Sequence, residues 1–211
     1  MNSIVLLCGG DNAGKTTTLR KFFEGYLVYR RERMNFYTRI LGDRIVYGVG
    51  DDSPQEKQQL KTKTLCDVDC VKEDIKKRIR LCDVEAKGQS YILIIPYGMY
   101  ENLDRKQLNE ECFLQPICWL RTETGFNVFP FYLRKTNATH LAKKDEIARK
   151  VCLKEIDTTR NDFDKSKDVE KFIIDFILNF PSPDVHHPEE NCPSPKTHQN
   201  LCDDSLLLRK N

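Results

Sequence analysis

Apolar runs of strand length alternate along the chain with segments of helical periodicity. Residues 3–8 (SIVLLC) and 91–95 (YILII) are continuous apolar runs, as expected of strands buried on both faces of a sheet. Between them, NFYTRI at 35–40 and IVYGVG at 45–50 flank a Gly-Asp turn and predict a β-hairpin. The alternation predicts an α/β fold with a mainly parallel central sheet, one antiparallel hairpin strand and helices on both faces.

Segments of helical spacing separate these strands. A first helix is predicted over residues 15 to about 29, and a third over 105–121, which Pro116 would kink or split. The last helix has Ser166 or Asp168 available as its N-cap. The second helix is amphipathic, with apolar residues three and four positions apart: Val68, Val71, Ile75, Ile79 and Cys82. The last helix has one apolar stripe, which we assign to the core: Val169, Phe172, Ile173, Phe176, Ile177 and Phe180.

Two later runs complete the predicted sheet. VFPFYL at 128–133 is a strand in which Pro130 removes one ladder donor, and this favours an edge position or a bulge. A polar helix near 139–150 leads into VCLKEI at 151–156, the last predicted strand.

The composition changes near residue 180. Five of the nine prolines lie between residues 181 and 195, in a stretch with little apolar content. We therefore predict one domain over residues 1–180, followed by a proline-rich tail over 181–211.

Overall charge and apolar content indicate which classes of partner the sequence supports. The 34 Lys and Arg against 32 Asp and Glu give a net charge of +2, with both signs spread along the chain. Such a balance does not support nucleic-acid binding. No apolar run approaches the roughly 20 residues that span a bilayer, and no signal-like segment opens the chain. We expect a soluble, cytoplasmic protein with no membrane association.

The chain contains nine cysteines. Most occupy positions where a small apolar residue would serve, so we expect unpaired thiols in a reducing compartment. The tail adds a loose His and Cys collection that leaves zinc binding as an alternative: His186, His187, Cys192, His198 and Cys202.

The strongest functional signal is GGDNAGKT at 9–16, directly after the first apolar run. It fits the phosphate-loop pattern G-x-x-x-x-G-K-[ST] and lies between a predicted strand and a predicted helix. Main-chain amides of such a loop cradle phosphate oxygens, the lysine reaches the β- and γ-phosphates, and the hydroxyl binds Mg²⁺. The predicted nucleotide contacts are Gly9, Asp11, Asn12, Ala13, Gly14, Lys15, Thr16 and Thr17.

A metal ion at such a loop also requires an acidic residue, normally at the end of a neighbouring strand. IVYGVGDD ends in Asp51, which we predict to hold Mg²⁺ together with Thr16, directly or through water, with Asp52 as a substitute. A turn or helix-cap role is the structural alternative for Asp51. Gln55 follows and is positioned to orient an attacking water, so Lys15 and Gln55 are the predicted catalytic residues.

Residues 9–22, GGDNAGKTTTLRKF, resemble the phosphate loop and first helix of the small GTPases related to ADP-ribosylation factors. The order of elements over roughly residues 1–180 is similar as well, so the resemblance implies the three-layer P-loop NTPase fold. In that family a D-x-x-G-Q-like segment follows the hairpin, and DDSPQE places Asp51 and Gln55 correspondingly. Thr38 is a candidate for the switch threonine of that family.

Two departures from that family concern turnover and base specificity. Pro54 stands where the family has a glycine whose amide binds the γ-phosphate, and proline has no N–H to donate. The guanine-reading N-K-x-D is absent, because the run at 128–133 continues into RKTNATH. Both ATP and GTP remain candidate ligands, with ATP favoured.

A second resemblance competes with the first. The run CLKEIDTT at 152–159 and the helix after it look like the closing portion of small P-loop kinases. That resemblance implies a cationic lid after the preceding strand. The alternative for these basic residues is an ordinary helix face exposed to solvent. The candidate lid residues are Arg134, Lys135, Lys143, Lys144 and Arg149.

Three functions are therefore open. The leading hypothesis is a Mg²⁺-dependent P-loop NTPase, and the second is a small-molecule or nucleotide kinase that transfers the γ-phosphoryl group of ATP. The third is a nucleotide-binding interaction module without turnover. A protein partner would use the hairpin, segment 51–64 or the tail.

Overall fold

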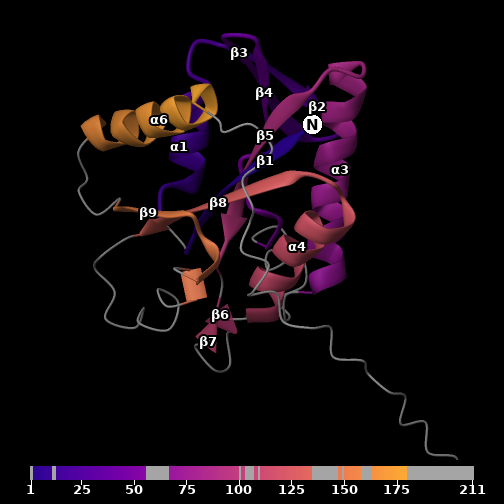
Figure 1. Ribbon diagram of the computed structural model, residues 1–211, viewed down its shortest axis with the longest axis vertical. Helices are drawn as coiled ribbons and strands as arrows, with labels where there is room; N and C mark the ends of the chain where they lie inside the picture. The colour runs from indigo at the N-terminus through magenta and orange to yellow at the C-terminus, as the bar shows by residue number, and fades with distance from the viewer. Residues whose placement is uncertain are drawn as a thin grey trace, which may run out of the picture.

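The computed structural model describes residues 2–10, 13–55, 67–99, 101–102, 107–108, 110–134, 147–148, 150–157 and 163–179. Its strands are β1 (Ser3–Gly9), β2 (Leu27–Arg31), β3 (Met34–Leu41), β4 (Arg44–Val49), β5 (Tyr91–Gly98), β6 (Glu101–Asn102), β7 (Gln107–Leu108), β8 (Asn127–Arg134) and β9 (Lys154–Asp157). Its helices are α1 (Lys15–Phe22), α3 (Val68–Ala86), α4 (Glu110–Glu123) and α6 (Phe163–Leu178) (Figure 1).

Seven strands form one mixed sheet in the order β2-β3-β4-β5-β1-β8-β9, and β6 pairs with β7 in a small separate sheet. The pairs β4–β5, β5–β1, β1–β8 and β8–β9 are parallel. Strand β3 is antiparallel to both of its neighbours. The predicted α/β class, the mainly parallel sheet and the antiparallel hairpin strand are confirmed.

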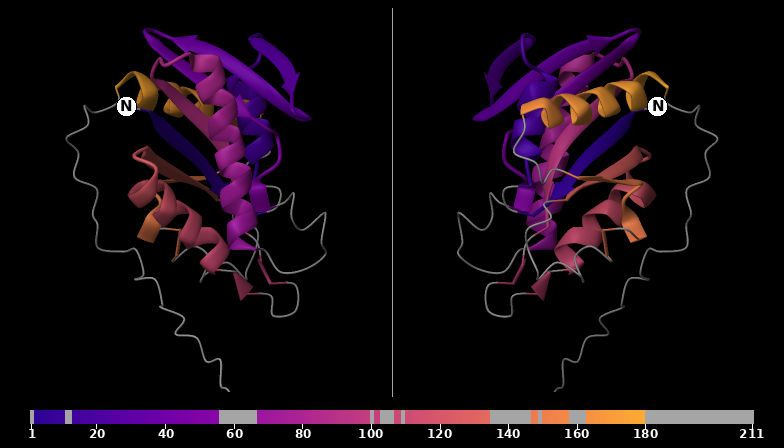
Figure 2. Two further views of the ribbon diagram at one scale, coloured as in Figure 1. Left: turned by 90° about the vertical axis from the view of Figure 1, so that its right-hand side faces the viewer. Right: turned by 90° about the vertical axis from the view of Figure 1, so that its left-hand side faces the viewer.

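The sheet is covered on both faces. Side chains of β1 alternate between two buried clusters, with Ile4 and Leu6 in one and Val5 and Leu7 in the other. The first cluster includes apolar side chains of α3 and α4, and the second includes those of α1 and α6. Figure 2 shows α3 and α4 over one face and α6 across the other. A continuous apolar run at β1 follows from this double burial.

The first helix is shorter than predicted. Helix α1 ends at Phe22, and Leu27–Arg31 forms the edge strand β2 instead of a continuation of the helix. Gly25 has a φ of 80°, a left-handed conformation that ends helical geometry. The residues that follow it, LVY, are apolar or aromatic and favour a strand.

Strand β8 lies inside the sheet, between β1 and β9, so the predicted edge position is wrong. The carbonyl oxygen of Pro130 accepts a hydrogen bond from the amide of Leu153, which precedes β9. A strand residue directs its N–H and C=O to the same side, so the nitrogen of Pro130, which carries no hydrogen, also faces β9. The β8–β9 pairing begins only at Phe131 and Lys154, so no ladder hydrogen bond is lost at Pro130. The proline is tolerated there.

Helix boundaries differ from prediction at two further places. Helix α4 begins at Glu110, and Pro116 lies within it without splitting it. Helix α6 begins at Phe163, so Ser166 and Asp168 lie inside the helix and the predicted cap is wrong. Ile173 and Ile177 are buried, as predicted for its apolar stripe. The tail over 181–211 lies outside the described residues.

The cysteines divide into two groups. Cys8, Cys70, Cys82, Cys112 and Cys152 are free thiols. Cys118 of α4 is disulfide-bonded, so the expectation of unpaired thiols is wrong at this position. Pairing depends on whether two Cβ atoms come within about 4 Å of each other, which spacing along the sequence does not reveal.

No helix in the described part of the chain combines the length and the apolar character needed to cross a membrane.

Candidate functional site

The predicted phosphate loop lies at the carboxyl end of β1, the strand between β5 and β8. The carbonyl of Gly9 accepts a hydrogen bond of 2.9 Å from the amide of Met99, just after β5. On the other side, the carbonyl oxygen of Leu133 in β8 would be 3.0 Å from a Cβ atom at position 9. The chain crosses one face of the sheet after β1 and the opposite face after β5. Ligand crevices of open α/β sheets form where connections diverge in this way.

The loop ends on the N-terminus of α1. Gly14, the N-cap residue, has a φ of 86°, and a Cβ atom there would meet nothing within 4 Å. Among the described residues no side chain caps the helix, and its first turn has no acidic residue. The positive end of the helix dipole is therefore left open to an anion.

Lys15 turns its side chain into the loop. The residue is only 4% exposed, and its Nζ atom donates to the carbonyl oxygen of Gly10 at 2.7 Å. The same oxygen accepts from the amide of Ala13 at 3.3 Å. The ammonium group is thus held inside the turn, on a main-chain acceptor. Asp11 and Asn12 lie outside the described residues, and Thr17 is exposed.

Thr16 joins the loop to the end of β4. Its Oγ1 atom donates to the main-chain oxygen of Asp51 at 2.8 Å. The two residues meet although β5 lies between β4 and β1, so the assumption that Asp51 ends a strand next to β1 is wrong. The segment after β4 reaches the loop across the carboxyl end of β5.

The carboxylate of Asp51 is engaged by three donors. Oδ2 accepts from Arg20 Nη2 at 2.8 Å and from Asn35 Nδ2 at 2.7 Å. Oδ1 accepts a short hydrogen bond from the hydroxyl of Tyr37. Burial favours the neutral acid, but the hydrogen bonds from Arg20, Tyr37 and Asn35 outweigh it and lower the pKa of Asp51. In this conformation the carboxylate accepts hydrogen bonds from the protein's own side chains.

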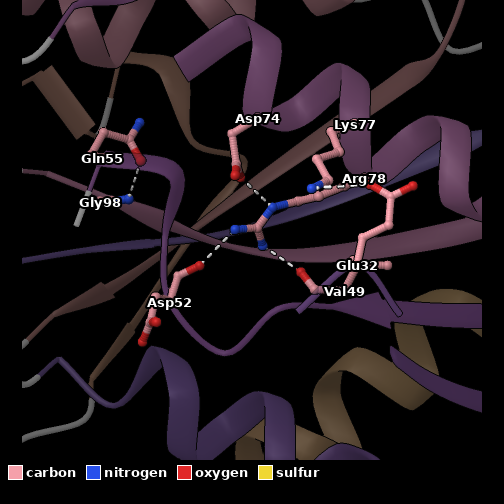
Figure 3. Close-up of polar contacts among 8 residues, drawn as sticks. All are labelled: Glu32, Val49, Asp52, Gln55, Asp74, Lys77, Arg78 and Gly98. Atoms are coloured by element: carbon pink, nitrogen blue, oxygen red, sulfur yellow. Dashed lines mark hydrogen bonds and ion pairs between the residues drawn. The ribbon is translucent and has the colours of Figure 1, made fainter. Parts of the chain in front are cut away.

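Arg78 belongs to α3, which packs on the face of the sheet opposite to α1. It bonds the residues on either side of Gly50 and Asp51 (Figure 3). Its side chain is fully buried, and Nε donates to Asp74 at 2.6 Å. Nη1 donates to the main-chain oxygen of Val49, and Nη2 donates to that of Asp52 at 2.8 Å. Sequence reasoning missed this residue. The sequence signal that could have identified Arg78 is its position on the apolar stripe of the helix, three residues after Ile75 and four after Asp74.

Gln55 does not face solvent. It is 1% exposed, and its Oε1 atom accepts from the amide of Gly98 at 3.0 Å (Figure 3). Its Nε2 atom donates to the carbonyl of Cys112 at 3.5 Å. The side chain therefore ties the end of β5 to α4. The water-orienting role stays a prediction that requires the amide to leave these partners.

Two residues from the family resemblances lie further from the loop. Thr38 pairs with Leu27 and Tyr47 in β3, which β4 and β5 separate from β1, so contact with a phosphate would require the strand to move. Arg134 ends β8 and forms an ion pair with Glu155 at 2.8 Å. The other predicted lid residues lie outside the described ones: Lys135, Lys143, Lys144 and Arg149.

The donors fit a phosphate better than they fit a free metal ion. Within the described ranges, no three His, Cys, Asp or Glu side chains cluster as a metal site would require, and the His and Cys residues of the tail lie outside these ranges. The open N-terminus of α1 and the buried ammonium of Lys15 suit an anion. Thr16 supplies a hydroxyl at the start of the helix for a cation that a phosphate brings with it.

Comparisons with known proteins do not assign a family. No protein-family model matches the chain, and no curated protein matches it. The crystal structure of APE1195 has a related backbone arrangement, with 13% sequence identity and a TM-score of 0.44 over 84% of this chain and 95% of that chain. Similarity at this level assigns neither a family nor a chemistry.

Proposed function

We propose that the protein binds a nucleoside triphosphate with Mg²⁺ at residues 9–16 and acts as a P-loop NTPase. The observation that carries this proposal is the position of Lys15, whose buried ammonium lies inside a turn that ends on the uncapped N-terminus of α1. Burial of a lysine ammonium is costly without strong partners. A triphosphate would replace the Gly10 carbonyl as the acceptor and would also meet the open end of the helix dipole.

The ligand favoured by this proposal is ATP. No N-K-x-D motif follows β8, so the chain lacks the aspartate that would read a guanine ring. Thr16 would bind the Mg²⁺ that accompanies the phosphates, and the ion supplies neutralising charge on the β- and γ-phosphate oxygens when it is bound.

A nucleotide-binding module without turnover is the second candidate. Gln55 favours it, because both polar ends of this side chain are bound to main-chain groups. Pro54, next to it, has no amide to offer a γ-phosphate. In the NTPase proposal hydrolysis is therefore slow, and in the second candidate the nucleotide state alone matters.

Part of the predicted partner surface is the hairpin of β3 and β4, which lies beside the edge strand β2. Leu27 and Val28 of the edge strand β2 are exposed, as is Ile40 of β3. Exposed apolar side chains on an edge strand are features of surfaces that receive another protein.

A thermal-shift panel tests the binding proposal. ATP, GTP, ADP and GDP are each added with and without Mg²⁺, and a ligand at 100 times its Kd should stabilise the fold by about 2.7 kcal/mol. We expect the largest shift with ATP and Mg²⁺, and its loss in Lys15→Ala. Lys171→Ala, an exposed lysine of α6, is the matched control and should keep the shift. The absence of a shift with every triphosphate, or a shift that survives Lys15→Ala, would refute the site.

Phosphate release separates the candidates. An NTPase releases phosphate from ATP without an acceptor, whereas the module binds ATP and releases none. The kinase hypothesis requires faster ATP consumption when an acceptor is supplied.

A further inference from the structure

The hydroxyl of Thr16 is oriented by its neighbour. A threonine hydroxyl has one proton and two lone pairs. Here the proton is directed to the main-chain oxygen of Asp51 at 2.8 Å, so the lone pairs point elsewhere. Such a hydroxyl is prepared to ligate a cation, because a cation binds the lone pairs and repels the proton.

The carboxylate of Asp51 is already bound by other side chains. Arg20, Asn35 and Tyr37 occupy three of its roughly four acceptor sites. Redirecting it to a metal would break an ion pair and leave a partly buried amide and a partly buried phenol without their acceptor.

We propose that Asp51 is a positioning residue, which serves the metal side of the nucleotide site through its main-chain oxygen while its carboxylate anchors that oxygen in place. Arg20, Asn35 and Tyr37 are the anchors. This assignment rests on the proposed function, because it concerns the Mg²⁺ that accompanies the bound triphosphate.

The anchor has a simple geometry. Thr16 and Arg20 are four residues apart on α1, so they project from one face of the helix. Thr16 bonds the main chain of Asp51 and Arg20 bonds its side chain, which fixes the residue on that face at two points. From the opposite side, Arg78 holds the oxygens of Val49 and Asp52. The segment that contains Asp51 is therefore held from both directions.

The test is the effect of Mg²⁺ on ATP affinity, measured as the ratio of the Kd values without and with the ion. Arg20→Ala should reduce this gain by about two- to fivefold, because Arg20 is 61% exposed and solvent screens its ion pair with Asp51. If the carboxylate were instead a metal ligand, Arg20→Ala would release it and increase the gain. The two roles thus predict opposite signs.

A double-mutant cycle sharpens the distinction. Asp51→Ala keeps the main-chain oxygen but loses all three anchoring contacts, so it should lose at least as much of the gain as Arg20→Ala. The double variant should lose no more than Asp51→Ala alone. Arg20→Lys should recover part of the gain. Affinity for ATP without Mg²⁺ should stay within about twofold in all variants, because Lys15 is untouched.

An unchanged or larger gain in Arg20→Ala, additive losses in the double variant, or an equal loss of Mg²⁺-free affinity would each overturn the assignment. Wild-type protein that binds no triphosphate under either condition would overturn the proposed function, and this assignment with it.

Discussion

The main chain of Gly50 lies directly against the buried guanidinium of Arg78. A Cβ atom at position 50 would be 3.0 Å from Nη1 and 3.2 Å from both Cζ and Nη2. Gly50 also has a φ of 74°, which L side chains rarely adopt. Two independent constraints therefore require glycine where the chain leaves β4.

Replacing this glycine should destabilise the fold strongly. Gly50→Ala places a methyl group in the left-handed region, at about 1–2 kcal/mol, and drives it into a fixed cation, at about 1–3 kcal/mol more. We expect the free energy of unfolding in urea to fall by about 2–5 kcal/mol from these two terms. Gly88→Ala is the control, because Gly88 has a φ of 85° and nothing lies within 4 Å of its added Cβ. A loss at Gly50 no larger than the loss at Gly88 would contradict the contact with Arg78.

The clamp formed by Arg78 should be among the most sensitive sites in the chain. Arg78→Ala removes one donor each from the carboxylate of Asp74 and from the main-chain oxygens of Val49 and Asp52. We expect a loss of about 3–5 kcal/mol in chemical unfolding, as for one partner removed from a buried ion pair.

Arg80 provides the comparison on the same helix. It is 67% exposed, and its only described ion pair, with Glu32, is long at 3.7 Å. Arg80→Ala should change the unfolding free energy by no more than about 0.5 kcal/mol. Similar losses for the two variants would mean that Arg78 gains nothing from its buried position.

The parts of the fold that follow from one segment at a time could be predicted from the sequence. Continuous apolar runs located β1 and β5, because strands buried on both faces have no polar face to display. Helix α3 followed from its spacing of three and four residues. Strand β2 was missed because its short apolar run directly follows a real helix, and one glycine marks the boundary.

The site could be predicted only in part, because its contacts come from distant segments. The glycine loop is contiguous, so its position after β1 was readable. The partners of Asp51 come from α1 and β3, and strand order decides which of them meet. Gln55 has a sequence position compatible with water activation, but its amide satisfies main-chain groups that only the folded chain brings near.

Asp51 should contribute a pH-dependent part of the stability. The pKa of its carboxyl is lowered in the folded state, despite burial, by hydrogen bonds from Arg20, Tyr37 and Asn35. The unfolded chain therefore binds the proton more tightly, and this stabilisation is complete above the ordinary value of 3.8 and is lost as the pH falls through the lower, folded value. Urea unfolding between about pH 6 and 2 should show a shallower acid loss in Asp51→Asn than in wild type.

Asp43→Asn is the matched variant for this measurement. Asp43 is a carboxylate in the β3–β4 turn that is 96% exposed, with only a long contact of 3.9 Å to Arg44. Its replacement removes the same charge without removing contacts with three donors. It should therefore reduce the loss of unfolding free energy at low pH less than Asp51→Asn does. Equal flattening would show that net charge, and not the anchored carboxylate, sets the acid dependence.

The phosphate loop allows a comparison of two adjacent glycines. A Cβ atom at Gly9 would be 2.7 Å from Ala13 Cβ and 3.0 Å from the main-chain oxygen of Leu133. Among the described residues, one at Gly10 would meet only Met99 O at 3.9 Å. Gly9→Ala should therefore displace the loop, lower the unfolding free energy by about 1–3 kcal/mol and weaken ATP binding about tenfold if about 1.4 kcal/mol of that strain reaches the site. Gly10→Ala should leave both nearly unchanged.

The two contacts of Gly9 differ in how far they can yield. Ala13→Gly in the background of Gly9→Ala removes the contact at 2.7 Å but leaves the carbonyl of Leu133, which belongs to a buried strand paired on both sides. Rescue of stability in the double variant should therefore be partial, and denaturant titration of the four proteins measures it as a coupling energy. Complete rescue would mean that β8 yields to the methyl group, and no rescue would mean that the strand alone excludes it.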